Sequence, residues 1–325
     1  MRVLVTGATG FTGGVLAHYL VGAGERVRAL VRPASLNRSR GLCDAGIEVV
    51  SGDLANAASL EAACQDIEVV YHIAATYRSA GRASAYREVN VDGTRRLLDA
   101  AQVAGVGRVV HCSTGGVHGH IEHPPATEEA PLSPGDVYQE TKLEGERLAR
   151  DRGEVGGMEV VVARPIGIYG PGDTRFLKLF RLASGRVMLG DGSAFYHLTF
   201  VEDLAEGFHL CGTVPAAAGR TYLLAGRRYT TLSKLVELIA SELGSSPPSL
   251  SIPVWPVWLA GALCELTCAP FSVEPPLYRR RVEFFTKSRA FDASRARREL
   301  GFIPKVELEE GIHRTAVWYR GQGML

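Results

Sequence analysis

Short apolar runs alternate with amphipathic stretches over the first half of the chain. The runs are rich in valine and apolar at consecutive positions, as in strands that are buried on both faces of a parallel sheet. The stretches between them have the apolar spacing of helices that cover such a sheet. The predicted strands are 3–5, 27–31, 49–50, 69–73, 109–112 and 159–163, and the predicted helices are 13–22, 60–64, 89–104 and 138–150.

The pattern changes after Arg164 and Pro165, where glycine and proline become frequent. Helical stretches at 174–182 and 232–243 alternate there with irregular segments. The sequence therefore predicts an α/β fold with two parts. Residues 1–165 form a Rossmann-type, doubly wound parallel sheet, to which a later strand and helix near 195–212 also belong. Residues 166–325 form mainly a smaller, discontinuous C-terminal lobe that binds substrate.

Composition narrows the class of protein. The chain has 325 residues, 46% of them hydrophobic and 22% charged, which indicates a globular protein. Its net charge of +1 gives no reason to expect nucleic acid as a partner. Six scattered cysteines without a CxxC pair are typical of free thiols in a reducing compartment. A strand beginning at Arg2 leaves no room for a signal peptide, so we expect a cytoplasmic protein.

Residues 252–271 contain Trp255 and Trp258 and are mostly apolar. Three prolines and Glu265 interrupt this segment, which is too broken for a membrane span. We expect a helix of the smaller lobe, buried or docked on a surface, and most of its aromatic residues in the core. Peripheral contact with a membrane remains open.

The first predicted strand is followed by Gly7-Ala-Thr-Gly10-Phe-Thr-Gly13, which opens the first helix. Gly7 and Gly10 permit a tight turn and close approach to a pyrophosphate, Gly13 lets helix and strand pack closely, and the helix N-terminus supplies N–H groups. On a strand–turn–helix unit this string predicts a Rossmann dinucleotide site. The expected cofactor contacts in the loop are Gly7, Thr9, Gly10, Phe11, Thr12 and Gly13.

The second strand ends in Arg32-Pro33, without the acidic residue that would accept from the ribose of NAD. Arg32 can pair with a 2′-phosphate, with Arg38 or Arg40 as helpers, so we favour NADP over NAD. Asp53 and Leu54 follow the third strand, where the adenine is usually met; alternatively, Asp53 caps a helix beginning near Ala57.

Tyr138 and Lys142 are four residues apart, which places both side chains on one face of a helix. A phenol titrates near about pH 10 and is a poor base at neutral pH. A nearby ammonium and a nicotinium ring would favour the phenolate, which can then exchange a proton with a substrate hydroxyl. Ser113 and Thr114 end a strand and can orient the same substrate oxygen.

These motifs, in this order, resemble those of the extended short-chain dehydrogenases/reductases, which include the NAD-dependent epimerase/dehydratases and the 3β-hydroxysteroid dehydrogenases. The resemblance implies an NAD(P)-dependent enzyme that transfers a hydride at a secondary alcohol or ketone carbon of a small molecule. It also implies a homodimer formed through 89–104 and 138–150. The matching stretches are residues 6–13, 52–54, 72–75, 90–94, 113–119, 138–142, 164–172 and 291–295.

The resemblance also implies roles for particular residues. Thr114, with Ser113 beside it, takes the place of the catalytic hydroxyl, and Asn90 that of a buried asparagine near the active site. The expected catalytic residues are thus Thr114, Tyr138, Lys142, Ser113 and Asn90. Ala74, Ala75, Pro165 and Ile168 are further expected cofactor contacts, and Thr76, His118, Tyr196 and Arg281 are expected substrate contacts.

Three chemistries are open within the family. The resemblance implies that a sugar-nucleotide 4,6-dehydratase would have an Asp-Glu pair directly after the catalytic threonine. This chain has Gly115-Gly116 there, which disfavours a dehydratase. A nucleotide-sugar 4-epimerase would usually have an arginine where Tyr196 stands, although one of the arginines at 279–281 could compensate. Residues 195–203 resemble the steroid branch, so we favour a dehydrogenase or reductase of a bulky, partly apolar substrate, with the epimerase as the alternative.

Two other hypotheses are weaker. A dinucleotide sensor without catalysis is disfavoured by the intact Thr114, Tyr138 and Lys142. His118, His120 and His123 lack a neighbouring carboxylate or cysteine to complete a ligand set, so no metal site is predicted.

Overall fold

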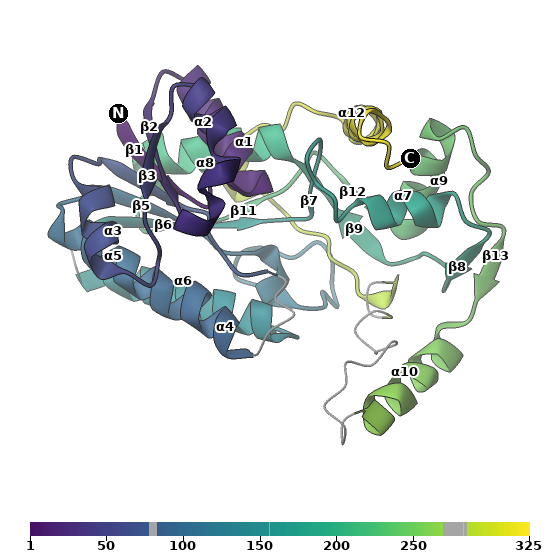
Figure 1. The fold of residues 1–325 in the computed structure, drawn as a ribbon. Helices are drawn as coiled ribbons and strands as arrows, with labels where there is room; N and C mark the ends of the chain where they lie inside the picture. The colour runs from purple at the N-terminus through teal and green to yellow at the C-terminus, as the bar shows by residue number, and fades with distance from the viewer. Residues whose placement is uncertain (78–82, 156, 269–281, 283–284) are drawn as a thin grey trace.

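A seven-stranded parallel sheet organises the N-terminal part of the computed structural model, which describes residues 1–77, 83–155, 157–268, 282 and 285–325 (Figure 1). The strand order is β11-β6-β5-β4-β1-β2-β3, with the order reversing beside β1 as in doubly wound folds. The predicted fold class is therefore confirmed. The strands are β1 (Arg2–Thr6), β2 (Arg26–Val31), β3 (Glu48–Ser51), β4 (Val69–His72), β5 (Arg108–Cys112), β6 (Glu159–Pro165) and β11 (Thr221–Leu224).

Helices cover both faces of this sheet, which explains why its strands are apolar on consecutive positions (Figure 1). One face packs against α1 (Phe11–Gly22), α2 (Arg40–Asp44) and α8 (Val201–Thr213), and the other against α3 (Ala57–Cys64), α5 (Thr94–Val103) and α6 (Val137–Val155). Shorter pieces are η1 (Pro33–Arg38), α4 (Ala83–Arg87), the π-helical η2 (Glu88–Gly93), η3 (Gly115–His118), η4 (Pro215–Ala217) and η6 (Ala296–Leu300).

The C-terminal lobe has a separate core, in which Phe180, Leu235 and Tyr319 are fully buried. The helices that form it are α7 (Leu177–Ala183), α9 (Leu232–Glu242) and α12 (Leu308–Gly321). Three two-stranded sheets complete the lobe: β7 (Ile168–Tyr169) with β10 (Thr199–Phe200), β9 (Phe195–His197) with β12 (Tyr229–Thr231), and β8 (Val187–Leu189) with β13 (Leu250–Ile252). Between these segments, α8 and β11 return the chain to the large sheet.

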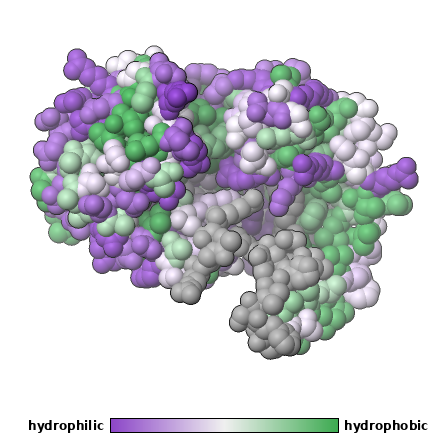
Figure 2. Space-filling model, viewed as in Figure 1, coloured by the Kyte–Doolittle hydropathy of each residue, from purple (hydrophilic) through white to green (hydrophobic). Residues whose placement is uncertain are grey.

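Helix α10 (Val254–Cys268) projects from the lobe, and hydrophobic residues gather there on the surface (Figures 1 and 2). Trp255 is 70% exposed and Trp258 45% exposed, so the expectation that the aromatic residues of this segment lie in the core was wrong for both tryptophans. No helix in the described part of the chain is long and apolar enough to cross a membrane.

Candidate active site

The loops after β1, β4, β5 and β6 open at one edge of the sheet, because these strands are parallel. Gly7 has φ +78°, and a Cβ there would lie 2.8 Å from the backbone nitrogen of Ala74. A Cβ on Gly13 would lie 2.3 Å from the carbonyl oxygen of Gly7. Only glycine allows this close packing, which brings the glycine loop against the loop after β4.

The glycine loop fits a dinucleotide. No side chain caps α1 at Gly10, so the first-turn N–H groups of the helix can bind an anion. Thr9, Phe11 and Thr12 are partly exposed around this helix start. The residues present would therefore hold the pyrophosphate of a nicotinamide dinucleotide.

Residues 32–40, which directly follow β2 in the described part of the chain, include arginines and no acidic side chain. Arg32 directly follows β2 and is exposed, without a hydrogen bond from its side chain to any described residue. Arg38 Nη2 donates to Ser35 Oγ at 3.1 Å. Asn56, and not Asp53, caps α3 through Ser59 N, while Asp53 Oδ1 accepts from Ala55 N at 2.9 Å.

Tyr138 and Lys142 lie on consecutive turns of α6, as the spacing predicts. The Tyr138 ring packs edge-on against the Tyr77 ring, with 4.8 Å between centroids. Lys142 is 1% exposed, and its ammonium makes no hydrogen bond to a described residue. A buried cation without a protein partner indicates a ligand group at this point.

Burial controls the titration of both groups. It raises the pKa of the Tyr138 hydroxyl, Cys112 and Tyr77 add to the increase, and the charge of Arg175 opposes it. Burial lowers the pKa of Lys142, while Cys112 and Glu146 act in the opposite direction. Without a cofactor, Tyr138 is thus a proton donor, and the phenolate expected from sequence requires an additional positive charge.

Thr114 and Ser113 differ in what their hydroxyls do. Thr114 Oγ1 accepts from Gly116 N at 3.1 Å, which leaves its proton available to a substrate oxygen. Ser113 Oγ donates to Glu146 Oε2 at 2.6 Å, and Ser113 is 1% exposed. The geometry therefore favours Thr114 over Ser113 as the hydroxyl that contacts substrate.

A buried ion pair lies behind Ser113. Arg164 Nη2 and Glu146 Oε1 are 2.5 Å apart, with side chains 3% and 1% exposed. Arg164 Nη1 donates to His118 Nε2 at 3.0 Å, and His118 Nδ1 is 3.1 Å from the carbonyl oxygen of Ala130. His118 is 1% exposed and both ring nitrogens have protein partners, which leaves little of its surface for the expected contact with substrate.

Asn90 connects α6 to the loop after β4. Its Oδ1 accepts from Thr76 N at 2.8 Å, and its Nδ2 donates to Thr76 O and Thr141 Oγ1, both at 3.1 Å. Gly145 allows this approach, because a Cβ there would lie 2.4 Å from the carbonyl oxygen of Asn90. The amide is thus occupied by protein partners and positions the loop and helix around Tyr138.

His72 joins this arrangement to the glycine loop. Thr94 Oγ1 donates to Asn90 O at 2.8 Å, so it accepts from His72 Nε2 at 2.9 Å. His72 Nδ1 then accepts from Thr6 Oγ1 at 2.9 Å, and Thr6 Oγ1 accepts from Ala74 N at 3.2 Å. The hydroxyl protons fix the His72 tautomer.

Gly115 leaves no room for a side chain. A Cβ at this position would lie 2.0 Å from Ile166 Cδ1. An acidic residue after Thr114 would therefore require Ile166 to move, which gives a physical reason for the glycine where a dehydratase would have an acid.

Other expected site residues are spread over the two parts of the fold. Pro165 ends β6, Ile168 begins β7, and Leu54 packs in the core on one face of the sheet. Tyr196 is 9% exposed within the core of the C-terminal lobe. Ala75 is exposed beside the partly exposed Thr76, and Arg281 lies outside the described residues.

Sequence analysis missed Glu146, Asp173 and Arg175. Glu146 is four residues beyond Lys142, so helical spacing alone could have placed it beside the catalytic pair. Asp173 and Arg175 follow the 164–172 motif, but their contacts join segments that are distant in sequence and gave no local signal.

Comparisons with known proteins agree with these features. A family model described as "NAD dependent epimerase/dehydratase family" matches residues 3–225, well over half of the chain. The chain is 32% identical over 299 residues to 3beta-hydroxysteroid-dehydrogenase/decarboxylase isoform 2 of Arabidopsis thaliana, covering 85% of this chain and 52% of that protein. It thus spans about half the length of this relative, and 66% of isoform 1.

Two other relatives match over nearly their whole length. A 3 beta-hydroxysteroid dehydrogenase/Delta 5-->4-isomerase of Mycobacterium tuberculosis (strain CDC 1551 / Oshkosh) is 32% identical, covering 98% of this chain and 90% of that protein. A UDP-glucose 4-epimerase of Mycolicibacterium smegmatis is 31% identical, covering 99% of each chain. A double mutant of the dTDP-glucose 4,6-dehydratase DesIV from Streptomyces venezuelae, solved with NAD bound, superposes with a TM-score of 0.78 at 27% identity, covering 98% of this chain and 97% of that chain.

Proposed function

The chain belongs to the NAD-dependent epimerase/dehydratase family, as its motifs predicted, and we propose that it is a dehydrogenase or reductase of a bulky, partly apolar secondary alcohol or ketone. The observation that carries this proposal is the grouping at one sheet edge of the glycine loop, Thr114 and the Tyr138–Lys142 pair. Such a grouping can hold a dinucleotide and exchange a proton with a substrate oxygen.

The nicotinamide, when bound, supplies or accepts the hydride. Tyr138 Oη gives its proton to the carbonyl oxygen in the reductive direction and takes it back in the oxidative direction. Thr114 donates a hydrogen bond to the same oxygen and fixes its orientation. Lys142 places a positive charge near the phenol and the cofactor, and it offers N–H donors to a ligand oxygen. The backbone N–H groups at the start of α1 hold the pyrophosphate.

Two features support an apolar substrate over a sugar nucleotide. Tyr196 stands where an epimerase would usually place an arginine against the diphosphate, and its side chain is buried in the lobe core. The exposed apolar side chains of α10 give the C-terminal lobe a surface on which apolar molecules can collect. Such a surface also agrees with peripheral contact to a membrane.

A nucleotide-sugar 4-epimerase is the second candidate. The UDP-glucose 4-epimerase of M. smegmatis matches over 99% of its length, and that chemistry needs only the same tyrosine, lysine, hydroxyl and cofactor. Thermal-shift measurements with UDP-glucose, GDP-mannose and a panel of sterols separate the two candidates, because a ligand that binds tightly stabilises only the folded state. A large shift with a sugar nucleotide and none with sterols would reject the apolar substrate.

We also propose a preference for NADP, supported by the exposed Arg32 after β2. Arg32 can form a bidentate pair with a 2′-phosphate, and no acidic residue there accepts from a ribose hydroxyl. Titration of NADP and NAD into the same preparation tests this preference, and tighter binding of NAD would contradict it.

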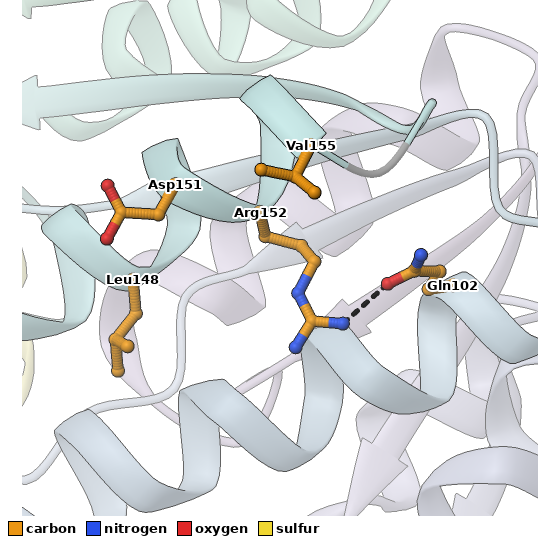
Figure 3. Close-up of a pocket in the computed structure, with 5 residues that line it drawn as sticks. All are labelled: Gln102, Leu148, Asp151, Arg152 and Val155. Atoms are coloured by element: carbon orange, nitrogen blue, oxygen red, sulfur yellow. Dashed lines mark hydrogen bonds between the residues drawn. The ribbon is translucent and has the colours of Figure 1, made fainter.

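The outer surface of α5 and α6 is the proposed homodimer interface. Val103 and Val155, at the ends of these helices, are 76% and 89% exposed. A depression between the helices is lined by Gln102, Leu148, Asp151, Arg152 and Val155 (Figure 3). It lies near the C-terminal ends of α5 and α6. Light scattering of the wild type and of Val155→Asp tests this interface, and an unchanged oligomer would reject it.

A further inference from the structure

Arg175 is held rigidly at the junction of the two parts of the fold. Its Nε donates to Asp173 Oδ1 at 2.7 Å, and its backbone N–H donates to the same oxygen at 2.9 Å. Asp173 is 3% exposed, and its carbonyl oxygen accepts from the hydroxyl of Tyr319 at 2.5 Å. These contacts orient a long side chain that would be mobile on an open surface.

Two aromatic rings flank the Arg175 guanidinium. Its Cζ lies 5.6 Å from the centroid of Phe11 and 5.4 Å from that of Tyr77. Phe11 is the first residue of α1 after the glycine loop, and Tyr77 packs against Tyr138. The guanidinium therefore lies between the helix start that binds a pyrophosphate and the proposed proton donor.

The two terminal nitrogens of Arg175 make no hydrogen bond to any described residue, although only 34% of the side chain is exposed. Asp173 contacts the Nε side, so the pair of Nη N–H groups remains available. Such a pair matches the two oxygens of a phosphate or carboxylate.

We propose that Arg175 is an oxyanion-binding residue of the cleft, whose Nη groups hold a phosphate or carboxylate of the bound ligand. The anion has two sources: the diphosphate of the dinucleotide or a carboxylate of the substrate close to the reacting carbon. This inference rests on the proposed function in one respect, namely that the active-site cleft lies beside the glycine loop and Tyr138. A structural residue that merely joins the two parts would not need two terminal NH2 groups without a hydrogen-bond partner among the described residues.

The test compares Arg175→Met and Arg175→Lys with Arg181→Met, a control that removes the same charge from an exposed position on α7. Calorimetry measures the binding of the cofactor that the wild type binds more tightly, of ADP-ribose, and of adenosine, which lacks a diphosphate. A second series, at saturating cofactor, measures a long-chain 3-oxo carboxylic acid and its methyl ester. Thermal unfolding of each variant reports any loss of structure.

If the anion is the diphosphate, Arg175→Met weakens the cofactor and ADP-ribose by about 10- to 100-fold, the range for a lost hydrogen bond to a charged group, and leaves adenosine unchanged. Arg175→Lys falls between, and Arg181→Met resembles the wild type. If the anion is a substrate carboxylate, cofactor binding is unchanged and the preference of the wild type for the acid over its ester disappears.

Affinities within about twofold of the wild type in both series would overturn the proposal, whether or not the 3-oxo acid binds. A lower melting temperature with unchanged affinities would do so too, since it would leave Arg175 a purely structural role. These measurements need no turnover, so a failure of the proposed hydride transfer would appear separately as bound cofactor without reaction.

Discussion

Replacing Arg164 by methionine should destabilise the protein strongly, because it removes the partner of a buried carboxylate. Glu146 is 1% exposed and receives hydrogen bonds from Arg164 and from Ser113. Arg164→Met leaves the carboxylate with only the serine hydroxyl. Breaking a buried ion pair on one side costs about 3–5 kcal/mol. At roughly 2–4 °C per kcal/mol for large domains, the melting temperature should fall by on the order of 10 °C.

Urea unfolding and thermal unfolding of Arg164→Met measure this cost, and the double variant Arg164→Met/Glu146→Met completes the cycle. Removing both charges should recover more than half of the loss, because no unpaired charge then remains in the core. Lys234→Met is the matched control: its partner Glu237 and Lys234 itself are 51% and 60% exposed, so its cost should stay below about 1 kcal/mol.

A cost of less than about 1 kcal/mol for Arg164→Met would refute this reasoning, as would additive effects in the double variant. The activity should fall as well, because Ser113 and Thr114 lose the anchor that sets the end of β5. A variant that unfolds early but retains full turnover at low temperature would separate the stability role from the positioning role.

Three further predictions follow from other parts of the structure. Tyr138→Phe should lower turnover on a confirmed substrate by about 10²- to 10⁴-fold with cofactor binding retained; near-normal turnover would reject Tyr138 as the acid/base. Arg32→Ala should weaken NADP by about 10- to 100-fold and leave NAD unchanged, as measured by titration; equal effects on both cofactors would contradict the 2′-phosphate contact. Burial, with a smaller contribution from Lys142, lowers the pKa of His72 to about 3. The pKa of His72 is lower in the folded state than the value of about 6.5 in the unfolded state. The contribution of neutral His72 to the free energy of unfolding is therefore fully present above pH 6.5, and it declines by about 1.4 kcal/mol per pH unit as the pH falls. Urea midpoints at several pH values check this, and His72→Asn should show a shallower dependence.

The parallel sheet could be predicted because most of its strands are recognisable from their own residues alone. Runs such as 69–73 and 109–112 are apolar at nearly every position, with one buried histidine in each, which is typical of strands in a sheet covered on both faces. Strand β11 was missed, since Thr221–Leu224 lies in a glycine-rich region and completes the sheet only through pairing with β6. Short segments whose identity depends on a distant partner carry little signal of their own.

Site residues followed the same division. Gly7, Tyr138 and Lys142 belong to contiguous motifs whose spacing reflects their chemistry, so the sequence placed them in the right elements. The pairing of Arg164 with Glu146 joins a strand to a helix, and no local pattern encodes it. The prediction for helix α10 was wrong for another reason. Apolar composition indicates that a helix face is stable when it is buried, but it does not say whether residues of this chain bury it.

The hydrogen-bonded series through His72 has a direction. Protons point from Ala74 to Thr6, from Thr6 to the imidazole, from the imidazole to Thr94, and from Thr94 to Asn90. The His72 ring can therefore report on binding at the glycine loop. A shift of Thr6 or Ala74 on dinucleotide binding changes the hydrogen bond at Nδ1, whereas the bond from Nε2 to Thr94 stays nearly the same. The two ring nitrogens should therefore respond unequally in an isotope-labelled sample, which makes loading of the site observable without any substrate in hand.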